Sequence, residues 1–501
     1  MSRRDDSPRA QYRSVNATVR NGAMSGLFLD RLAHFSMMTP YEALPPQTVH
    51  QAKRAVLDLV GCALGGIRVG YNRSVHQYVH GLQGTPEAWV WGSGVRVPAP
   101  HAALVNGTKA HHLELDDGHL EAASHPGVSV IPAAIAVGET VGASGRDLIR
   151  AVVLGYEVCI RAGLAVAQGI REHGVHGPGM MGALGAATAA SLLMGLPERE
   201  MAAAMTTAGS LLPVSPYESF VEGTLTKDLY AGWAGFVGIV AAELARHGMN
   251  GPHRFLEGRY SVGRLLLHEG TSDTARLLSD LGQPFLIDQI YFKPFAASRA
   301  VHPTVTAVLE LMETHGFTAA DVETVDVETY PFAADLSAHS TLATPISARL
   351  NIPYSVAVAI RTGKLGPEAF LPEALADRET LALAERITVS PAARYGSGPT
   401  GARSSVVQIR LRDGRVLTRE VAHARWDRYR GPSDAELEAK FDSLAEGVMS
   451  AHRAPRVKAM LWQLDAQESI CHLASCLAGD GRDMDSVTEQ HSSGRIFEKE
   501  V

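Results

Sequence analysis

One stretch of the chain gathers the side chains that could do chemistry. Residues 111–119 read His-His-Leu-Glu-Leu-Asp-Asp-Gly-His, and Ser124-His125-Pro126-Gly127 follows soon after. Histidine, with an ordinary pKa of about 6.5, can take up and return a proton near neutral pH. Burying so many carboxylates and imidazoles is costly unless they pair with one another or bind a ligand. The segment therefore predicts a site for proton transfer or ligand binding.

The same segment allows two other interpretations. A polar loop between helices would hold these residues in water and give them no chemical role. Histidines and carboxylates are also metal ligands, although their spacing here matches neither a HExxH helix nor a Cys/His finger. A metal-dependent enzyme that uses the cluster from His111 to His125 therefore stays open as an alternative.

The sequence around this cluster resembles the MmgE/PrpD family over about residues 25–450. The resemblance lies in the order of many short blocks, since no single block would suffice. The blocks are Asn106-Gly107-Thr108, Asp116-Asp117, His125-Pro126, Ile131-Pro132-Ala133, Tyr156-Glu157-Val158, 176–185, 223–227, 231–234, 256–260, Lys293-Pro294-Phe295 with Arg299 and His302-Pro303, and 352–355.

This resemblance implies a reaction class. The family contains 2-methylcitrate dehydratases, cis-aconitate decarboxylases and iminodisuccinate epimerases, which act on small di- and tricarboxylates without a required metal or other cofactor. We therefore expect a lyase that removes a proton α to a carboxylate, with dehydration or decarboxylation. An epimerase would use the same carbanion chemistry with reprotonation on the other face. A non-catalytic binding protein is the remaining alternative.

The resemblance also implies which residues form the site. By position, His125, His176, Lys227 and His302 match the family's catalytic histidines and lysine. The residues expected to bind substrate are Glu114, Asp116, Asp117, His119, Lys293, Arg299 and Tyr354. These types suit the chemistry, because cations offset the charge that develops on the carboxylate and histidines move the proton.

Two positions depart from the family pattern. Glu114 stands where an aspartate is usual, and Gly118 stands where a threonine is usual. A threonine hydroxyl could hold a substrate carboxylate, and a site built around such a bond discriminates strongly between analogues. The substrate is therefore expected to differ from cis-aconitate and from 2-methylcitrate.

Mainly helical elements must position these residues. Apolar residues recur at helical spacing from Pro45 to a predicted stop at Gly65-Gly66, and again after Ser144, which with Asp147 resembles a capping box. Residues 183–196 and 233–245 are helices rich in Ala and Gly, whose thin side chains permit close packing. The first 265 residues thus appear as almost all helix.

The later part of the chain mixes strands with helices. Alternating residues at 322–330 and 406–421, with an Asp413-Gly414 turn, predict strands, while 303–314 and 353–362 predict helices. A capping box at Ser433 opens a further helix. We expect a mainly α protein whose parts are a disordered tail at 1–23, a helical domain at 24–270, an inserted α+β lid at 275–420, a return to the helical domain at 425–478 and a mobile tail at 479–501.

Composition narrows the class of protein and its partners. The net charge is −7 over 501 residues, which gives no broad basic surface for nucleic acid. No signal peptide is evident at the N-terminus, the apolar stretch at 232–245 is short for a membrane span, and the four cysteines form no CxxC pair. We expect a cytoplasmic protein with no nucleic acid and no membrane among its partners. The resemblance to the MmgE/PrpD family implies a homodimer that binds a small polycarboxylate.

Overall fold

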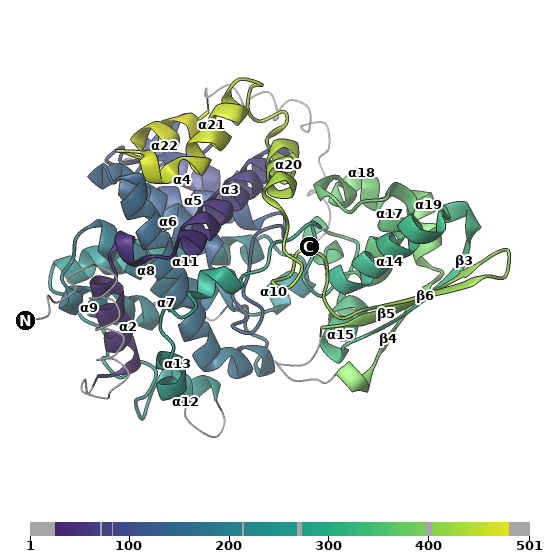
Figure 1. Ribbon diagram of the computed structural model, residues 1–501, viewed down its shortest axis with the longest axis horizontal. Coiled ribbons are helices and arrows are strands. Elements are labelled where there is room, and N and C mark those ends of the chain that lie inside the picture. Colours follow the sequence, from purple (N-terminus) through teal and green to yellow (C-terminus); the bar gives the residue numbers. More distant parts are fainter. Residues whose placement is uncertain are drawn as a thin grey trace, which may run out of the picture.

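The computed structural model describes residues 26–70, 73–82, 84–212, 215–267, 273–395 and 403–479. Within that part, a large helical body joins a smaller α+β region (Figure 1). The predicted fold class, mainly α with a smaller α+β region, is confirmed. The expected tails at 1–23 and 479–501 lie outside the described residues, apart from Gly479.

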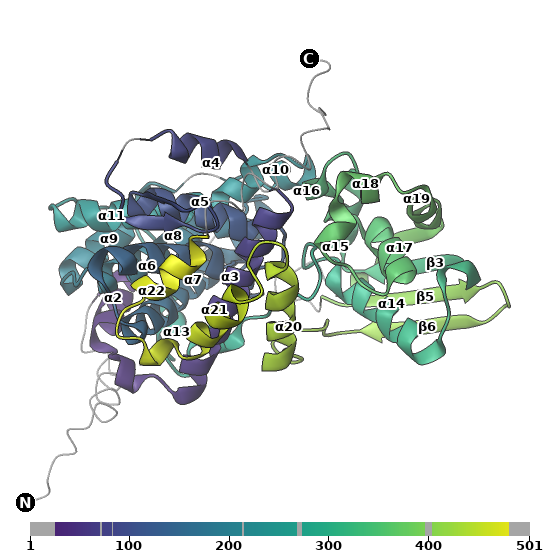
Figure 2. The same cartoon turned by 90° about the horizontal axis from the view of Figure 1, so that it is seen from above.

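The helical body is built from both ends of the chain. Its N-terminal helices are α2 (Phe28–Met38), α3 (Pro46–Arg68), α4 (Arg73–His80), α5 (Ala99–His111), α6 (Gly127–Val141), α7 (Gly145–Glu172), α8 (Pro178–Leu193), α9 (Glu198–Ser210), α10 (Glu218–Val221), α11 (Thr226–Arg246), α12 (Val262–Leu266) and α13 (Thr274–Leu278). The helices α20 (Asp434–Ala445), α21 (Arg453–Trp462) and α22 (Cys471–Leu477) pack beside α3 and α6 (Figure 2).

Local signals explain several of these helices. The predicted capping boxes are confirmed, since the Ser144 and Ser433 hydroxyls accept bonds from the backbone N–H groups of Asp147 and Glu436. One short hairpin, β1 (Ala88–Val90) and β2 (Val95–Val97), interrupts the part expected to be almost all helix.

The α+β region is a four-stranded sheet covered on one face. Its strands are β3 (Val322–Thr329), β4 (Ile387–Pro391), β5 (Ser405–Leu411) and β6 (Val416–Val421), in the order β4-β3-β5-β6, with β3 and β4 parallel and the other pairs antiparallel. Its helices are α14 (His302–His315), α15 (Pro331–His339), α16 (Pro345–Ala348), α17 (Ile352–Thr362), α18 (Pro372–Leu375) and α19 (Arg378–Ala384). Figure 1 shows α14, α17 and α19 on one side of the sheet. Alternate residues of β3 are buried beneath these helices, as the period of a half-covered strand requires.

Glycines on α3 serve close packing instead of ending the helix. The predicted stop at Gly65-Gly66 is wrong, because α3 continues to Arg68. A Cβ placed on Gly66 would lie 3.1 Å from the carbonyl carbon of Lys109, and one on Gly65 would lie 2.7 Å from Leu113 Cδ1. The two glycines therefore let α3 lie directly against the helix that leads into the cluster at 111–125.

The apolar helix α11 lies within the helical body. It is long and apolar enough to cross a membrane by length and composition alone, but 61% of its apolar window is buried inside the protein. It packs on α5, α8 and α9. The short apolar stretch expected at 232–245 is thus part of a longer helix, whose hydropathy is that of a core element.

We predict that Gly66→Ala destabilises the fold by about 1–3 kcal/mol, because the added methyl group overpacks the contact with the backbone of Lys109. Gly61→Ala on the same helix is the matched control, since its Cβ would lie 3.4 Å from Phe441 Cα in ordinary contact. Urea unfolding followed by circular dichroism measures both variants. Equal stability of the two variants would contradict this account of α3.

Candidate active site

The segment from His111 to Pro126 connects α5 to α6 and faces two ways. Leu113 and Leu115 are buried in the hydrophobic cluster that also forms the core of the α+β region. Glu114 and Asp116, which alternate with them, are buried among charged partners. Glu114 has a φ of 53°, a left-handed conformation that costs free energy for a residue other than glycine and is often found at functional sites.

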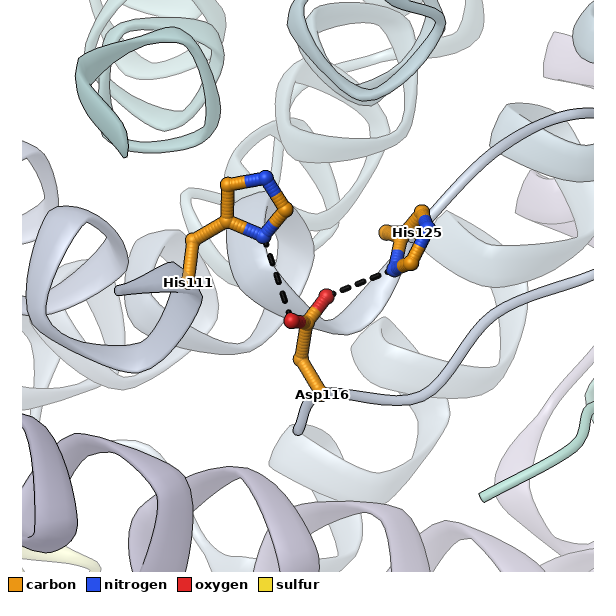
Figure 3. Close-up of side chains that lie close together, drawn as sticks. All are labelled: His111, Asp116 and His125. Carbon is orange, nitrogen blue, oxygen red and sulfur yellow. Dashed lines mark hydrogen bonds and ion pairs between the residues drawn. The ribbon is translucent and has the colours of Figure 1, made fainter. Parts of the chain in front are cut away.

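Asp116 joins two histidines (Figure 3). His125 Nδ1 lies 2.7 Å from one carboxylate oxygen, and His111 Nδ1 lies 3.2 Å from the other. Burial alone would raise the pKa of Asp116, but the two imidazoles outweigh it and hold that pKa well below its usual range. Since an ionised carboxylate only accepts hydrogen bonds, each Nδ1 carries the proton. His125 Nε2 is then left as a basic nitrogen.

The three residues His111, Asp116 and His125 form what we call the relay, and a cavity of about 110 Å³ adjoins it. The cavity has room for several water molecules or a small ligand. Both the helical body and the α+β region form its wall. Its principal polar and aromatic lining residues are Glu114, His119, Ser124, His125, Arg171, His176, Tyr217, Phe220, Tyr291, Ser298, Arg299, Tyr330 and Arg403.

The histidines on the cavity wall are held as neutral bases. Burial lowers the pKa of His125, and Asp116 opposes part of that shift. Burial, with the charges of His111 and Lys227, lowers the pKa of His176 well below its ordinary value. The Nδ1 of His176 is buried and has no hydrogen-bond partner among the described residues. A ligand in the cavity is one partner that could satisfy it.

Two lysines behind the cavity share one carboxylate. The Lys293 ammonium donates to Glu114 Oε2 at 2.9 Å, and the Lys227 ammonium donates to Glu114 Oε1. Burial would raise the pKa of Glu114, but the two ammonium groups hold it well below its usual range. Neither lysine lines the cavity itself.

The positive ends of helices also point to this place. His125 lies two residues before α6, and His176 lies two residues before α8. The N-cap of α8, Gly177, and its first residue, Pro178, line the cavity. The N-terminus of a helix carries a partial positive charge and free backbone N–H groups. Together with the arginines of the wall, this arrangement favours an anionic ligand.

Comparison with known proteins agrees with this site. The model of the MmgE/PrpD N-terminal domain matches residues 30–274, and that of the MmgE/PrpD C-terminal domain matches residues 295–466. The chain belongs to the MmgE/PrpD family. The resemblance seen in the sequence is thereby confirmed.

Several curated relatives are decarboxylases. The chain is 24% identical to a cis-aconitate decarboxylase-like protein, oryM, of Aspergillus oryzae, over 92% of this chain and 100% of that protein. It is 23% identical to the cis-aconitate decarboxylase of Aspergillus terreus over 93% of this chain and 97% of the relative. The Mus musculus enzyme is 31% identical over 51% of this chain and 52% of the enzyme. Family and relatives together support a lyase.

The structure brings together most of the residues expected from the family pattern. Glu114, His119, His125, His176 and Arg299 line the cavity. Four others lie in the buried network of ion pairs and hydrogen bonds next to it and do not line it; they are Asp116, Asp117, Lys227 and Lys293.

The two remaining expected residues, His302 and Tyr354, are also off the cavity wall. His302 is fully buried at the start of α14, and its Nε2 lies 3.0 Å from the carbonyl oxygen of Ala297. Tyr354 donates its hydroxyl proton to the carbonyl oxygen of Ala369 and packs on Phe370 within the α+β region. Both contacts are structural, since they tie one part of the α+β region to another.

Some wall residues were missed by sequence reasoning. They are Arg171, Tyr217, Phe220, Tyr291, Tyr330 and Arg403. Tyr291 could have been found, because it lies two residues before Lys293 in a family block. Arg403 carries no local signal, since only the folding of the α+β region brings it to residues of α7.

The absence of a side chain at Gly118 has a steric cause. A Cβ built on Gly118 would lie 2.6 Å from Tyr291 Cζ, and closer still to the Tyr291 hydroxyl. The backbones of the two residues also pair, with Gly118 N–H donating to the Tyr291 carbonyl at 3.1 Å and the reverse bond at 2.9 Å. Tyr291 thus occupies the room that the family's threonine would need.

The relay could also be considered as a metal site. One ligand atom from each of His111, Asp116 and His125 lies within 4.8 Å of the others. However, both oxygens of Asp116 already accept from imidazoles, and the Lys293 ammonium lies near enough to lower the pKa of Asp116. A divalent cation would have to displace these bonds and approach that positive charge, so the geometry fits a proton relay better.

We predict opposite pH effects for two buried groups. Burial, with Arg299 and Lys293, holds the pKa of His302 well below 6.5, so below about pH 6.5 the unfolded chain binds a proton that the folded chain does not. Burial, with Asp58, raises the pKa of Asp117 to about 8, so its folded-state proton stabilises the protein until the pH rises towards 8.

Urea unfolding of His302→Gln and Asp117→Asn at several pH values tests both signs. The stability of wild type relative to His302→Gln should fall as the pH drops from 7 to 5. The stability of wild type relative to Asp117→Asn should fall as the pH rises from 5 to 8. If the two stability differences change with pH in the same direction, the pKa of one of these groups is not shifted as described.

Proposed function

We propose that the protein is a lyase that removes a proton α to a carboxylate of a small di- or tricarboxylate, followed by loss of CO2 or of a β-hydroxyl. The observation that carries the proposal is His125, a neutral imidazole on the cavity wall whose Nδ1 is bound by the ionised Asp116. The decarboxylase relatives support the same reaction class.

His125 suits the role of the base. Asp116 fixes the Nδ1–H tautomer, so that Nε2 has the lone pair that accepts the proton. As His125 becomes an imidazolium, Asp116 stabilises its charge. His111, on the other side of Asp116, keeps the carboxylate in place.

The cavity also has groups for the charge that develops on the substrate. Removal of the α-proton moves negative charge onto the adjacent carboxylate, and positioned cations stabilise that transition state most. Arg299 lies on the same wall as His125 and His176. His176 is a second neutral imidazole and a candidate for returning the proton after the leaving group departs.

The alternatives differ in what they require of the same residues. An epimerase would use His125 and His176 on opposite faces of one carbanion, so product analysis decides between it and a lyase. A metal-dependent enzyme would need the relay of His111, Asp116 and His125 to bind an ion. A non-catalytic binding protein would leave the poised base unused.

We predict turnover of at least one small polycarboxylate, unaffected by EDTA. A panel of di- and tricarboxylates incubated with the enzyme in D2O and followed by NMR would show new alkene signals, CO2 release or deuterium exchange. Because the proposed steps use only side chains of the chain, activity should survive exhaustive chelation. Loss on EDTA treatment with recovery on one divalent metal would favour the metal-dependent alternative.

We predict that His125→Gln lowers kcat by about 10²–10⁴-fold, because it keeps a hydrogen bond but loses the base. The acidic limb of the pH–rate profile should vanish with it. His302→Gln is the matched control, since His302 is buried away from the cavity wall, and its kcat should stay within a few-fold of wild type. Unchanged kcat in His125→Gln would remove His125 from the mechanism.

We further propose that the protein is a homodimer. The outward side of α11 carries an apolar stripe at helical spacing, made of Leu229, Trp233, Phe236, Val240 and Leu244, none of which is fully buried. Trp233 is 37% exposed and stacks on Phe236 at 5.1 Å. An apolar face of this kind favours contact with a second copy.

We predict a dimer in light scattering at micromolar concentration. Trp233→Glu should shift it to monomer, because the carboxylate would be buried without a partner. Tyr260→Glu is the control, since Tyr260 is 91% exposed and lies outside α11. A monomeric wild type would contradict the proposal.

A further inference from the structure

The two buried lysines next to the cavity are already neutralised by the protein. The two oxygens of Glu114 each accept a bond from a different ammonium group, Lys227 and Lys293. Both lysines are buried, at 1% and 0% side-chain exposure, and the Glu114 side chain is 5% exposed. A substrate carboxylate could bind these ammonium groups only by displacing the Glu114 carboxylate. Glu114 is part of the protein and cannot leave the site as a bound anion could.

The other nearby carboxylates are also engaged. Asp228 Oδ1 lies 3.6 Å from the Lys227 ammonium, but Asp228 Oδ2 is bound to His112 Nδ1 at 2.6 Å. Asp116 is shared by His111 and His125. The charges behind the cavity are therefore balanced without a ligand.

The arginine side of the same cavity differs, because it holds buried donors without a partner among the described residues. Arg171, Arg299 and Arg403 all line it. The Nε and Nη1 atoms of Arg299 are buried and have no hydrogen-bond partner among the described residues, and its Nη2 lies 4.0 Å from Asp427. Arg171 and Arg403 each donate to the carbonyl oxygen of Leu120, a neutral acceptor. Arg171, Arg299 and Arg403 thus line one cavity, where a bound carboxylate would satisfy the two unpartnered donors of Arg299.

Arg299 is also placed for recognition. Its guanidinium carbon lies 5.0 Å from the centre of the Tyr291 ring, which fixes its plane. A guanidinium fork binds a carboxylate with two parallel N–H···O bonds. The unpartnered Nε and Nη1 atoms of Arg299 lie on different edges of this fork, so each edge keeps a free donor for a carboxylate oxygen in the cavity.

Two departures from the family pattern take up room next to the cavity. The Tyr291 ring fills the room over Gly118, and glutamate at position 114 reaches one methylene further than the usual aspartate. Glu114 keeps the charge of the usual aspartate, and each of its two oxygens binds one of the two ammonium groups.

We propose that Glu114 takes, with its own carboxylate, the place of one substrate carboxylate, and that Arg299, with Arg171 and Arg403, binds the carboxylate of a substrate that has two such groups and not three. This inference rests on the proposed lyase function and names its substrate class. A third carboxylate would find both ammonium groups already bound to Glu114, so it would be buried without a cation of its own. Glu114 is thereby a specificity-determining residue.

Two unreactive acids of matched skeleton test the proposal. 2-Methylsuccinate has two carboxylates, and tricarballylate carries a third in place of a hydrogen of the methyl group. Isothermal titration of the wild type should give a Kd at least about 10-fold lower for 2-methylsuccinate. Arg299→Gln should weaken its binding by about 10–100-fold, the range for a lost charge-assisted pair.

Glu114→Gln should narrow or reverse the preference, because it frees two ammonium groups for the third carboxylate. Glu139→Gln is the control, since Glu139 is a buried carboxylate that accepts from the Trp89 backbone and does not line the cavity. Circular dichroism melts establish that each variant is folded. The wild-type comparison and Arg299→Gln decide the proposal even if Glu114→Gln does not fold.

The outcomes separate this inference from the lyase function. Tighter wild-type binding of tricarballylate, an unchanged Kd in Arg299→Gln, or no binding of either acid at millimolar concentration would overturn it. If the enzyme turns over a tricarboxylate and also binds tricarballylate more tightly, the lyase function stands and only this inference is wrong. If the protein binds the dicarboxylate selectively but turns over no acid in the panel, the binding preference stands and the lyase function is wrong.

Discussion

Charge that is buried must be neutralised inside the protein, and the architecture of this site follows from that constraint. An isolated buried carboxylate or ammonium costs several kcal/mol, so each needs an opposite charge or several hydrogen bonds. The segment from His111 to Pro126 meets this demand in alternation, with Leu113 and Leu115 in an apolar cluster and Glu114 and Asp116 among cations. On the cavity wall, Arg299 keeps two buried donors without a partner among the described residues.

The helical body holds this network in register through small side chains. Because α3 meets the backbone of α5 at Gly66 without an intervening side chain, the end of α5 at His111 is fixed against a rigid neighbour. The α+β region is tied to the same segment, since Arg349 donates to the carbonyl oxygen of His112 at 2.8 Å. Movement of that region relative to the helical body would therefore shift the backbone next to His111, which is part of the relay.

Family membership and individual residues carry different information. The family indicates proton abstraction from a small carboxylate, and the relay of His125 and Asp116 suits that chemistry. Of the positions that differ, Glu114 lines the cavity, and Gly118 lies under the ring of Tyr291, which also lines it. In the proposed function, chemistry and specificity lie in neighbouring residues that can change separately, because His125 would act on the reacting carbon while Arg299 and Glu114 would select the ends of the substrate.

The sequence by itself determined the fold class, the capping boxes at Ser144 and Ser433, the hairpin around Asp413-Gly414 and the cluster from His111 to His125. These depend on local spacing, which one segment of chain contains in full. Only the tertiary structure decided that α3 continues through Gly66, that His302 and Tyr354 lie off the cavity wall, and that Arg171 and Arg403 meet there. Each of these depends on the distance between segments far apart in the chain, and on how buried charges are shared among them. Local spacing does not encode those distances, because they arise when the helical body packs against the α+β region.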